Sequence, residues 1–289
     1  MKRKFWIVLC LILIVLILLG TSSWYFSKYS LTTSYYEIFT EKLEKTLRIV
    51  QLSDLHNSVF GEDNEKLVHK VAEQSPDLIV LTGDMLNGNE KEISIAKQLI
   101  VELSKIAPVY ASYGNHEKDY EENYSISLLE EYEQAGANVL EFMYNDIVVD
   151  GQQIRIGGLF GYCTPEKYLE TNEADPEECV FLDEFQSTDH YTMLLTHMPY
   201  SWIANDAISE WDIDCVFTGH DHGGQIRIPL IGGLYAPDQG LFSGKDAGLY
   251  YSQDDEKVMI LSRGLGSAGW IPRLNNIPEI VVVDIIPEP

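Results

Sequence analysis

The stretch Thr-Gly-His-Asp-His-Gly-Gly-Gln-Ile-Arg-Ile-Pro, residues 218–229, decides how the rest of the chain is interpreted. In it, His220 and His222 follow an apolar run and precede a pair of glycines. Because the two histidines are two residues apart, they project to the same face of an extended segment. The glycines let the backbone pass close to a bound group. The stretch therefore predicts a pair of metal ligands at the end of a strand.

Four earlier apolar runs also end in side chains that can bind a metal. Each run has the length and composition of a buried strand. In α/β proteins, ligands bind beyond the carboxyl ends of such strands. The runs at 47–53, 77–83, 108–114 and 191–196 lead, in that order, into Asp54 and His56, into Asp84, into Asn115 and His116, and into His197.

The spacing of these runs predicts an α/β fold. Helices are expected at 63–74 and 91–106, between the first three strands, and Asp63 is the expected N-cap of the first helix. This alternation indicates a parallel sheet with crossover helices. After a third helix near 126–134, short strands around the turn at 150–151 indicate antiparallel pairing. We therefore expect two packed sheets with helices outside.

The first 27 residues are expected to lie outside the folded domain. Basic residues at 2–4 precede a mostly apolar stretch without charges at 5–27. Roughly 20 apolar residues span a bilayer, and the basic side tends to stay cytoplasmic. The sequence therefore predicts a single-pass protein of the cell membrane. It would have a transmembrane anchor at 1–27, a stalk at 28–46 and an extracellular domain at 47–289.

A cleaved signal peptide is the alternative for the same segment. The small residues that follow Gly20 offer a cleavage site. Trp24, Tyr25 and Phe26 favour the anchor, because aromatic residues gather at the membrane interface. Either interpretation places the domain outside the cytoplasm.

The part of the chain beyond the anchor is strongly acidic. Without the basic residues at 2–4, 17 lysines and arginines face 45 acidic residues, a net charge of −28 with neutral histidines. Such a surface repels nucleic acid and anionic headgroups over a Debye length of ~8 Å. We therefore expect no nucleic-acid partner. The acidity also keeps an exported protein in solution.

The four cysteines do not form a metal or redox motif, because no pair has the C-x-x-C spacing. Cys10 and Cys215 lie within apolar runs and are expected to pack there. Cys163 and Cys179 could form a disulfide outside the cell.

The candidate ligands carry oxygen and imidazole donors without any thiolate. This set suits Mn, Fe, Zn or Ni and does not choose among them. Seven ligands are too many for one ion, but two ions ~3.5–4 Å apart that share a carboxylate would use them all. Such a pair ionises a bound water and neutralises phosphoryl charge, which suits in-line attack by hydroxide on a phosphoester. The seven are Asp54, His56, Asp84, Asn115, His197, His220 and His222.

His116 has a separate predicted role. It stands beside Asn115 but is expected to point elsewhere. We expect it to protonate the leaving oxygen or to stabilise the transition state. Ser53 and Thr218 precede ligands without a base arranged around them, so a covalent serine mechanism is not expected.

Together these motifs resemble the calcineurin-like metallophosphoesterase superfamily, over about residues 47–287. The form of the paired-histidine motif and the tail at 262–279 look more like its membrane-anchored bacterial branch than like the protein phosphatases. The resemblance implies a four-layer α/β/β/α sandwich of two mixed sheets, with 47–289 as the catalytic domain. The motifs are Asp54-Leu-His56, Gly83-Asp84, Gly114-Asn-His-Glu117, His197 and Gly219-His-Asp-His222.

The resemblance also implies how the ligands divide between the two ions. Asp84 would bridge them and His116 would be catalytic. One ion would be held by Asp54, His56, Asp84 and His222, and the other by Asp84, Asn115, His197 and His220.

Two departures from the family pattern refine this picture. Asp221 stands between the paired histidines where the bacterial branch often has Thr, and it should face away from the metals. Met-Leu-Asn-Gly follows Asp84 in place of the Asp-Arg of protein phosphatases, which argues against protein dephosphorylation. Arg263 and Arg273 could contact a substrate phosphate or could pair with carboxylates of the domain.

Three functions are compatible with the sequence. The first is a dinuclear phosphoester hydrolase at the outer membrane face, with Mn favoured because Ca prefers all-oxygen sites. The second is a hydrolase of a lipid-linked pyrophosphate, and the third is a non-catalytic, metal-bearing scaffold. The candidates for an aromatic rim, which would favour a lipid substrate, are Tyr162, Tyr200, Trp202 and Trp270.

Overall fold

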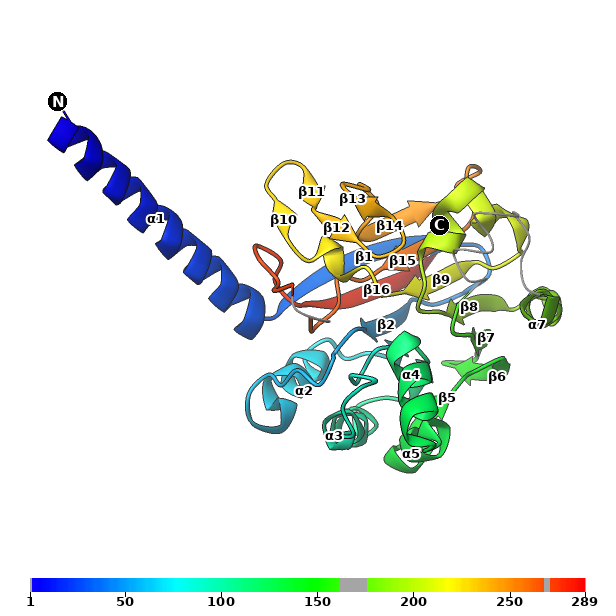
Figure 1. Ribbon diagram of the computed structural model, residues 1–289. Helices are drawn as coiled ribbons and strands as arrows, with labels where there is room; N and C mark the ends of the chain where they lie inside the picture. The colour runs from blue at the N-terminus through cyan, green and yellow to red at the C-terminus, as the bar shows by residue number, and fades with distance from the viewer. Residues whose placement is uncertain (1, 162–175, 268–270, 289) are drawn as a thin grey trace.

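The computed structural model describes residues 2–161, 176–267 and 271–288. A long helix, α1 (Lys2–Tyr29), projects from one side of the domain (Figure 1). Over Arg3–Tyr29 this helix is long and apolar enough to cross a membrane, by length and composition.

The first sheet contains six strands and a mixture of strand directions. In spatial order the strands are β1 (Thr32–Thr40), β16 (Glu279–Pro287), β2 (Leu47–Leu52), β3 (Leu78–Thr82), β4 (Val109–Ser112) and β5 (Ala137–Val139). β2 to β5 are parallel, whereas β16 is antiparallel to β2. The central strand β3 is buried along its whole length, as its apolar sequence predicts.

The second sheet also contains six strands. In spatial order they are β14 (Gly248–Tyr251), β15 (Val258–Leu261), β9 (Cys215–Thr218), β8 (Tyr191–Leu195), β7 (Gln152–Gly158) and β6 (Met143–Val149). Its central pairs, from β15 to β7, are parallel, and only the two outer pairs are antiparallel. The expectation of antiparallel strands in the later chain is therefore wrong for the centre of this sheet. Helices lie between β7 and β8 and between β8 and β9, which allows these two parallel crossovers.

The packing confirms the four-layer sandwich. Between the sheets, Ile49 and Val80 of the first belong to one apolar core with Met193 and Phe217 of the second. The other face of the first sheet packs on α2 (Glu65–Ala72), α3 (Ser94–Leu103) and α5 (Leu128–Ala135). The other face of the second sheet packs on α7 (Pro176–Gln186) and α8 (Tyr200–Ile203).

The segment expected to be a stalk at 28–46 is instead largely part of the fold. Residues 32–40 form β1, which pairs with β16 in parallel along its full length. Ile38 of β1 is buried in the core between the sheets. The polar and aromatic residues of this strand conceal it in the sequence, because an edge strand buries only part of its surface.

Two other local features differ from the sequence expectations. The N-cap of α2 is Asn64 rather than Asp63, and its side chain accepts a hydrogen bond from the Phe60 N–H at 2.9 Å. A further helix, α4 (Asn115–Tyr124), begins at the Asn115-His116 motif. It was missed because it is strongly polar and buries only Glu117 and Tyr120, which leaves no apolar stripe to detect.

After β9 the chain forms two short hairpins beside the sheets (Figure 1). The first joins β10 (Arg227–Ile228) to β11 (Gly232–Gly233), and the second joins β12 (Tyr235–Ala236) to β13 (Gly240–Leu241). They extend from the end of β9, where the paired histidines lie.

Candidate metal centre

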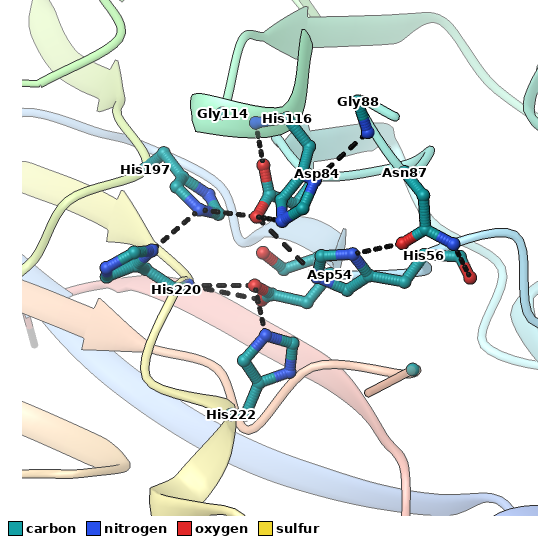
Figure 2. A network of polar contacts seen from close by, with 12 residues as sticks. Asp54, His56, Asp84, Asn87, Gly88, Gly114, His116, His197, His220 and His222 are labelled. Atoms are coloured by element: carbon teal, nitrogen blue, oxygen red, sulfur yellow. Dashed lines mark hydrogen bonds and ion pairs between the residues drawn. The ribbon is translucent and has the colours of Figure 1, made fainter. Parts of the chain in front are cut away.

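The two sheets deliver the candidate ligands to one place. The loops after β2, β3 and β4 of the first sheet carry three of the motifs, and the loops after β8 and β9 of the second sheet carry the others. Gln51 joins the sheets beside this place, because its Nε2 donates to Thr82 Oγ1 at 2.9 Å and to the Thr218 carbonyl at 2.8 Å. The residues gather as Figure 2 shows, although their motifs are far apart in the sequence.

The backbone turns sharply at the ligand positions. Five of the seven candidates have a positive φ, a conformation uncommon outside glycine and least unfavourable for Asp, Asn and His. Each such residue costs roughly 1–3 kcal/mol and persists where the surroundings over-determine it. The five are Asp54 (53°), His56 (46°), Asp84 (55°), His220 (71°) and His222 (48°).

Asp84 lies between two groups of candidate ligands. Its Oδ2 is 3.5 Å from His56 Nε2 on one side and 3.2 Å from His197 Nε2 on the other. The first group continues through Asp54, whose Oδ1 is 3.5 Å from His222 Nε2. Three groups of described residues could hold a metal ion: Asp54, His56 and His222; His56, Asp84 and His116; and Asp84, His197 and His220.

The histidine tautomers are fixed by partners outside these groups. His56 Nδ1 donates to Asn87 Oδ1 at 3.0 Å, and His197 Nδ1 donates to the Thr82 carbonyl at 2.8 Å. His220 Nε2 lies 3.2 Å from Asp238 Oδ2. When an outward nitrogen carries the proton, the inward nitrogen of the neutral ring presents a lone pair. Asn87 and Asp238 were not identified from the sequence.

Buried polar atoms without partners test whether metal ions fit this site. Among the described residues, His56 Nε2, His222 Nδ1 and Asn115 Oδ1 are buried with no hydrogen-bond partner. Unpaired buried polar atoms are costly, so each calls for an explanation. Nitrogen and oxygen donors without thiolates fit divalent cations such as Mn, Fe or Zn. The residues present therefore fit two ions of this kind.

The pKa values of the acidic ligands favour their charged forms. Burial alone would raise the pKa of Asp84, but His197, His56 and His116 together outweigh it and hold this pKa well below its usual range. Burial opposes ionisation of Asp54 as well, and His222 with His197 lowers its pKa. Both carboxylates are thus available to cations.

The histidines divide into neutral and charged rings in the metal-free protein. Burial lowers the pKa of His222 to about 3 despite the nearby Asp54, and burial also lowers the pKa of His56. Burial acts in the same direction on His197, but Asp84, Asp54 and the Thr82 carbonyl together outweigh it and raise this pKa to about 10. A metal ion at His197 would therefore have to displace a proton.

His116 is oriented by the backbone of a neighbouring loop. Its Nδ1 accepts a hydrogen bond from the Gly88 N–H at 3.0 Å. The proton of the neutral ring must therefore be on Nε2, which lies 4.0 Å from Asp84 Oδ2 (Figure 2). The backbone N–H of His116 also donates to Asp84 Oδ1 at 2.8 Å. The ring thus presents an N–H donor to the centre.

Glu117 holds the backbone of the loops that carry the ligands. In the sequence it was identified only as part of a motif. Its Oε2 accepts from the N–H groups of Asp84 (2.7 Å) and Gly114 (2.8 Å), and its Oε1 accepts from the Met85 N–H (2.8 Å). Burial, and then the charge of Asp84, raises the pKa of Glu117 to about 7. This carboxylate joins the loop after β3 to the loop after β4.

The two arginines considered for phosphate binding have other partners. Arg273 is buried and donates to the carbonyls of Asn276, Arg263 and Gly266 at 2.8–3.0 Å. Arg263 Nε forms an ion pair with Glu279. These contacts favour a structural role for both residues.

The remaining candidates of the sequence lie away from the centre or outside the described chain. Trp202 belongs to α8 and is buried in the core on the outer face of the second sheet, so it does not form a rim. Tyr200 is only partly buried and belongs to α8. Asp221 bonds to Gln239, as expected for a side chain that faces away. Tyr162, Cys163 and Trp270 lie outside the described residues, and so does the proposed disulfide to Cys179.

A cavity of about 230 Å³ opens onto the candidate ligands. Asp84, His116 and His220 line it on the metal side. Tyr235 and Pro237, from the second hairpin after β9, also line it, together with Ile271. A phosphoester group in this cavity would meet the ligands and His116 together.

Fold and site define a hydrolase that acts through metal ions, and the comparisons with known proteins specify which kind. The family model of calcineurin-like phosphoesterases matches residues 47–224. An uncharacterized metallophosphoesterase of Aquifex aeolicus is 30% identical over 94% of this chain and 97% of its own length. The chain therefore belongs to the calcineurin-like phosphoesterase family and is a metal-dependent phosphoester hydrolase.

More distant relatives have named activities. The phosphodiesterase YaeI of Escherichia coli is 28% identical over 83% of this chain and 82% of its own. The UDP-2,3-diacylglucosamine pyrophosphatase LpxG of Chlamydia muridarum is 24% identical and covers 84% of each chain. Among solved structures, TT1561 of Thermus thermophilus is similar, with a TM-score of 0.46 and 14% identity over 75% of this chain and 88% of that one.

Proposed function

We propose that the protein is a dinuclear metal-dependent phosphoester hydrolase anchored by α1, with its catalytic domain on the outer face of the membrane. The observation that carries this proposal is the position of Asp84, whose Oδ2 lies between His56 and His197. A carboxylate in this position suits the bridge of a two-metal site.

The residues would divide between the ions as the family resemblance implies. One ion would be held by Asp54, His56, Asp84 and His222, and the other by Asp84, Asn115, His197 and His220. When bound, such a pair lowers the pKa of water and offsets the negative charge of the phosphoryl group. Manganese is the favoured metal, because the site offers both imidazole and oxygen donors.

His116 would supply the proton of the reaction. Hydrolysis adds the oxygen of water to phosphorus and breaks the bond from phosphorus to the ester oxygen, which leaves with a proton. The Gly88 N–H keeps Nδ1 unprotonated, so Nε2–H is the donor that faces the centre. As Nε2 passes its proton to the ester oxygen, the proton lost by the attacking water would restore the neutral ring. His116 is thus proposed as the general acid.

The proposed membrane anchor is supported by contacts between α1 and the domain. Ser23 Oγ accepts from the Asn275 N–H at 2.7 Å, and Ser27 Oγ accepts from the Asn276 N–H at 3.0 Å. A signal peptide cut near Gly20 would leave both serines in a short terminus without the rest of α1. Basic residues at 2–4 support an orientation with the domain outside.

Turnover of chromogenic substrates by the full-length protein in detergent tests this function. The protein is stripped of metal with a chelator, reloaded with Mn, and assayed on bis(p-nitrophenyl) phosphate and p-nitrophenyl phosphate. We expect Mn-dependent turnover that Asp84→Asn abolishes and that the exposed control Asp212→Asn retains. Two ions bound per chain without turnover of either substrate would instead favour a metal-bearing scaffold.

A further inference from the structure

The segment at 228–242, here called the apolar loop, exposes a group of large apolar side chains. Leu230 is fully exposed between β10 and β11, and Ile231 and Leu241 expose 61% and 67% of their surface. There is no charged residue at 229–237. Single exposed apolar residues are ordinary, but a contiguous group of them indicates a binding surface or a membrane contact.

The backbone of the apolar loop is strained where it presents these side chains. Leu230 has φ of 69° and Phe242 has φ of 56°, in the left-handed region that L side chains seldom adopt. Both side chains are exposed. Strained residues of this kind are found mostly at functional sites. Exposing apolar side chains to water gains no free energy that would offset the strained backbone. Contact with an apolar environment would offset it.

The apolar loop also borders the metal centre. Tyr235 and Pro237 belong to the loop and line the same cavity as Asp84 and His116. The exposed side chains described above belong to the same loop. Whatever the loop contacts is therefore next to the opening of the metal centre.

Hydrogen bonds hold α1 beside the start of this loop. The backbone N–H of Asn275 donates to Ser23 Oγ of α1 at 2.7 Å, and its Nδ2 donates to the Arg227 carbonyl at 3.0 Å. The next residue, Asn276, donates from Nδ2 to the carbonyl of His222 at 2.7 Å. The loop accordingly lies on the side of the domain from which α1 projects (Figure 1).

A second cavity, of about 320 Å³, lies where α1 meets the domain. Trp24, Ser27 and Lys28 of α1 line it. A lysine and a serine at the end of an apolar helix suit a lipid phosphate, because Lys28 would lie at the level of the headgroups. Ile271 lines this cavity and also the cavity of the metal centre. The two cavities are thus neighbours.

We propose that the apolar loop inserts into the outer leaflet beside α1 and that the metal centre hydrolyses a phosphoester carried by a membrane lipid. This inference rests on the proposed function and specifies its substrate class. The net charge of −28 beyond the basic residues at 2–4 opposes binding to anionic surfaces. Apolar contact is therefore the attraction, and insertion occurs in uncharged phosphatidylcholine and persists at high salt.

Fluorescence quenching in phosphatidylcholine nanodiscs tests the position of the loop. The full-length protein carries Cys10→Ser, Cys163→Ser and Cys179→Ser, and a polarity-sensitive dye is attached through Ile231→Cys. The control dye is attached through Val148→Cys, on the edge strand β6, where the native side chain is 68% exposed. We expect nitroxide groups on the acyl chains to quench the dye at 231 at least five-fold more than the dye at 148. Equal quenching would overturn the proposal and assign the surface to a protein partner.

A pair of substrates with the same leaving group tests the substrate class. The p-nitrophenyl ester of phosphatidic acid is held in the nanodisc, whereas bis(p-nitrophenyl) phosphate is in solution. We expect the double variant Leu230→Ser, Ile231→Ser to lower kcat/KM at least ten-fold for the lipid ester and less than two-fold for the soluble ester. The control Val148→Ser should change neither value.

The two levels of the proposal fail in different ways. A wild-type protein that hydrolyses the soluble ester but not the lipid ester would overturn the lipid substrate and leave the phosphoesterase activity intact. An equal loss on both esters in the double variant would also overturn it. Absence of turnover on both esters by the wild-type protein would contradict the proposed function, and the quenching comparison, which needs no turnover, would still decide the position of the loop.

Discussion

His116 is held in place by a backbone N–H rather than by a second titratable side chain. Gly88, in the loop after β3, donates to its Nδ1, and the carbonyl of the same Gly88 accepts from Asn123 Nδ2 of α4. The imidazole therefore has one defined neutral tautomer. Its role can be tested with substrates that differ only in how much they need a proton.

Replacing His116 with Gln should affect poor leaving groups most. We expect kcat for an alkyl phosphodiester to fall by about 10²–10⁴, the usual contribution of general acid catalysis. The loss for a p-nitrophenyl ester should be much smaller, because p-nitrophenolate leaves without a proton. Steady-state kinetics on the two esters measures the difference, with the exposed His69→Gln as control. An equal loss on both esters would contradict the acid role.

Replacing Glu117 with Gln should loosen the loops beneath the centre. In the wild-type protein the backbone N–H groups of Asp84, Met85 and Gly114 donate to carboxylate oxygens of Glu117. In the variant, the NH₂ group would replace one of these oxygens and would leave its N–H donors without an acceptor. Leaving buried donors unpaired costs about 1–3 kcal/mol each, so the free energy of unfolding should fall by at least that amount. Urea denaturation of the metal-free protein measures it.

The matched control for this variant is Glu122→Gln, an exposed position on the same helix α4. It should leave the free energy of unfolding within about 0.5 kcal/mol of the wild-type value. Equal stability of the two variants would mean that the contacts of Glu117 contribute nothing net.

At the scale of elements, the ends of the strands can approach one another closely because glycines without a Cβ lie against the ligand residues. A Cβ on Gly114, between β4 and α4, would lie 2.2 Å from Asp84 Oδ1. A Cβ on Gly264 would lie 2.7 Å from the Cβ of Asp54. These distances are far below van der Waals contact, so the loop after β4 meets the loop after β3, and the loop after β15 meets the loop after β2, through glycine backbone.

Gly114→Ala should therefore displace Asp84 and weaken metal binding at least ten-fold. Gly151→Ala is the control, because it lies in the turn between β6 and β7 with nothing within 4 Å of the added Cβ. It adopts φ of 86° and should cost only about 1–2 kcal/mol of stability without changing metal affinity. Titration with Mn by calorimetry compares the two. Normal affinity in Gly114→Ala would show that the loop has room to relax.

Most of the candidate site could be predicted from the sequence because its residues follow apolar strands directly. His197, for example, comes two residues after β8, and no other element intervenes. Glu117, Asn87 and Asp238 could not be assigned roles in this way. Their partners are backbone groups or histidines of other loops, and only the folded chain brings these together.

The fold was predictable to a similar extent. The buried strand β3 and the hairpin around Asp150 are local patterns, and the sequence identifies them. β1 and α4 were missed because their neighbours, rather than their own apolar residues, stabilise them. The parallel order of β7, β8 and β9 depends on crossovers that local patterns do not specify.

At the scale of the whole molecule, the metal centre joins the two sheets. Asp54 belongs to the first sheet and accepts a hydrogen bond from the N–H of His220 in the second, at 3.0 Å. His197 of the second sheet contacts Asp84 of the first. Ions bound between them would link the two halves of the sandwich.

Removing the metal ions should therefore lower the stability of the entire domain. A ligand present at a thousand times its Kd stabilises the folded state by about 4 kcal/mol. We expect chelation to lower Tm and Mn to restore it better than Ca, which prefers all-oxygen sites. Scanning calorimetry with and without Mn measures the shift, and Asp84→Asn should show none. An equal effect of Ca would argue against imidazole ligands.

The pairing of β1 with β16 has a consequence for how the chain is made. Thr32 pairs with Glu279 and Thr40 with Pro287, so the edge strand beside α1 has no partner until β16 has been synthesised. β16 also separates β1 from β2, so the first sheet cannot close around an incomplete chain. Sequence-distant pairing of this kind slows folding. The first sheet can therefore be completed only after β16 has left the ribosome or translocation channel, and truncation anywhere in β16 would leave two exposed strand edges.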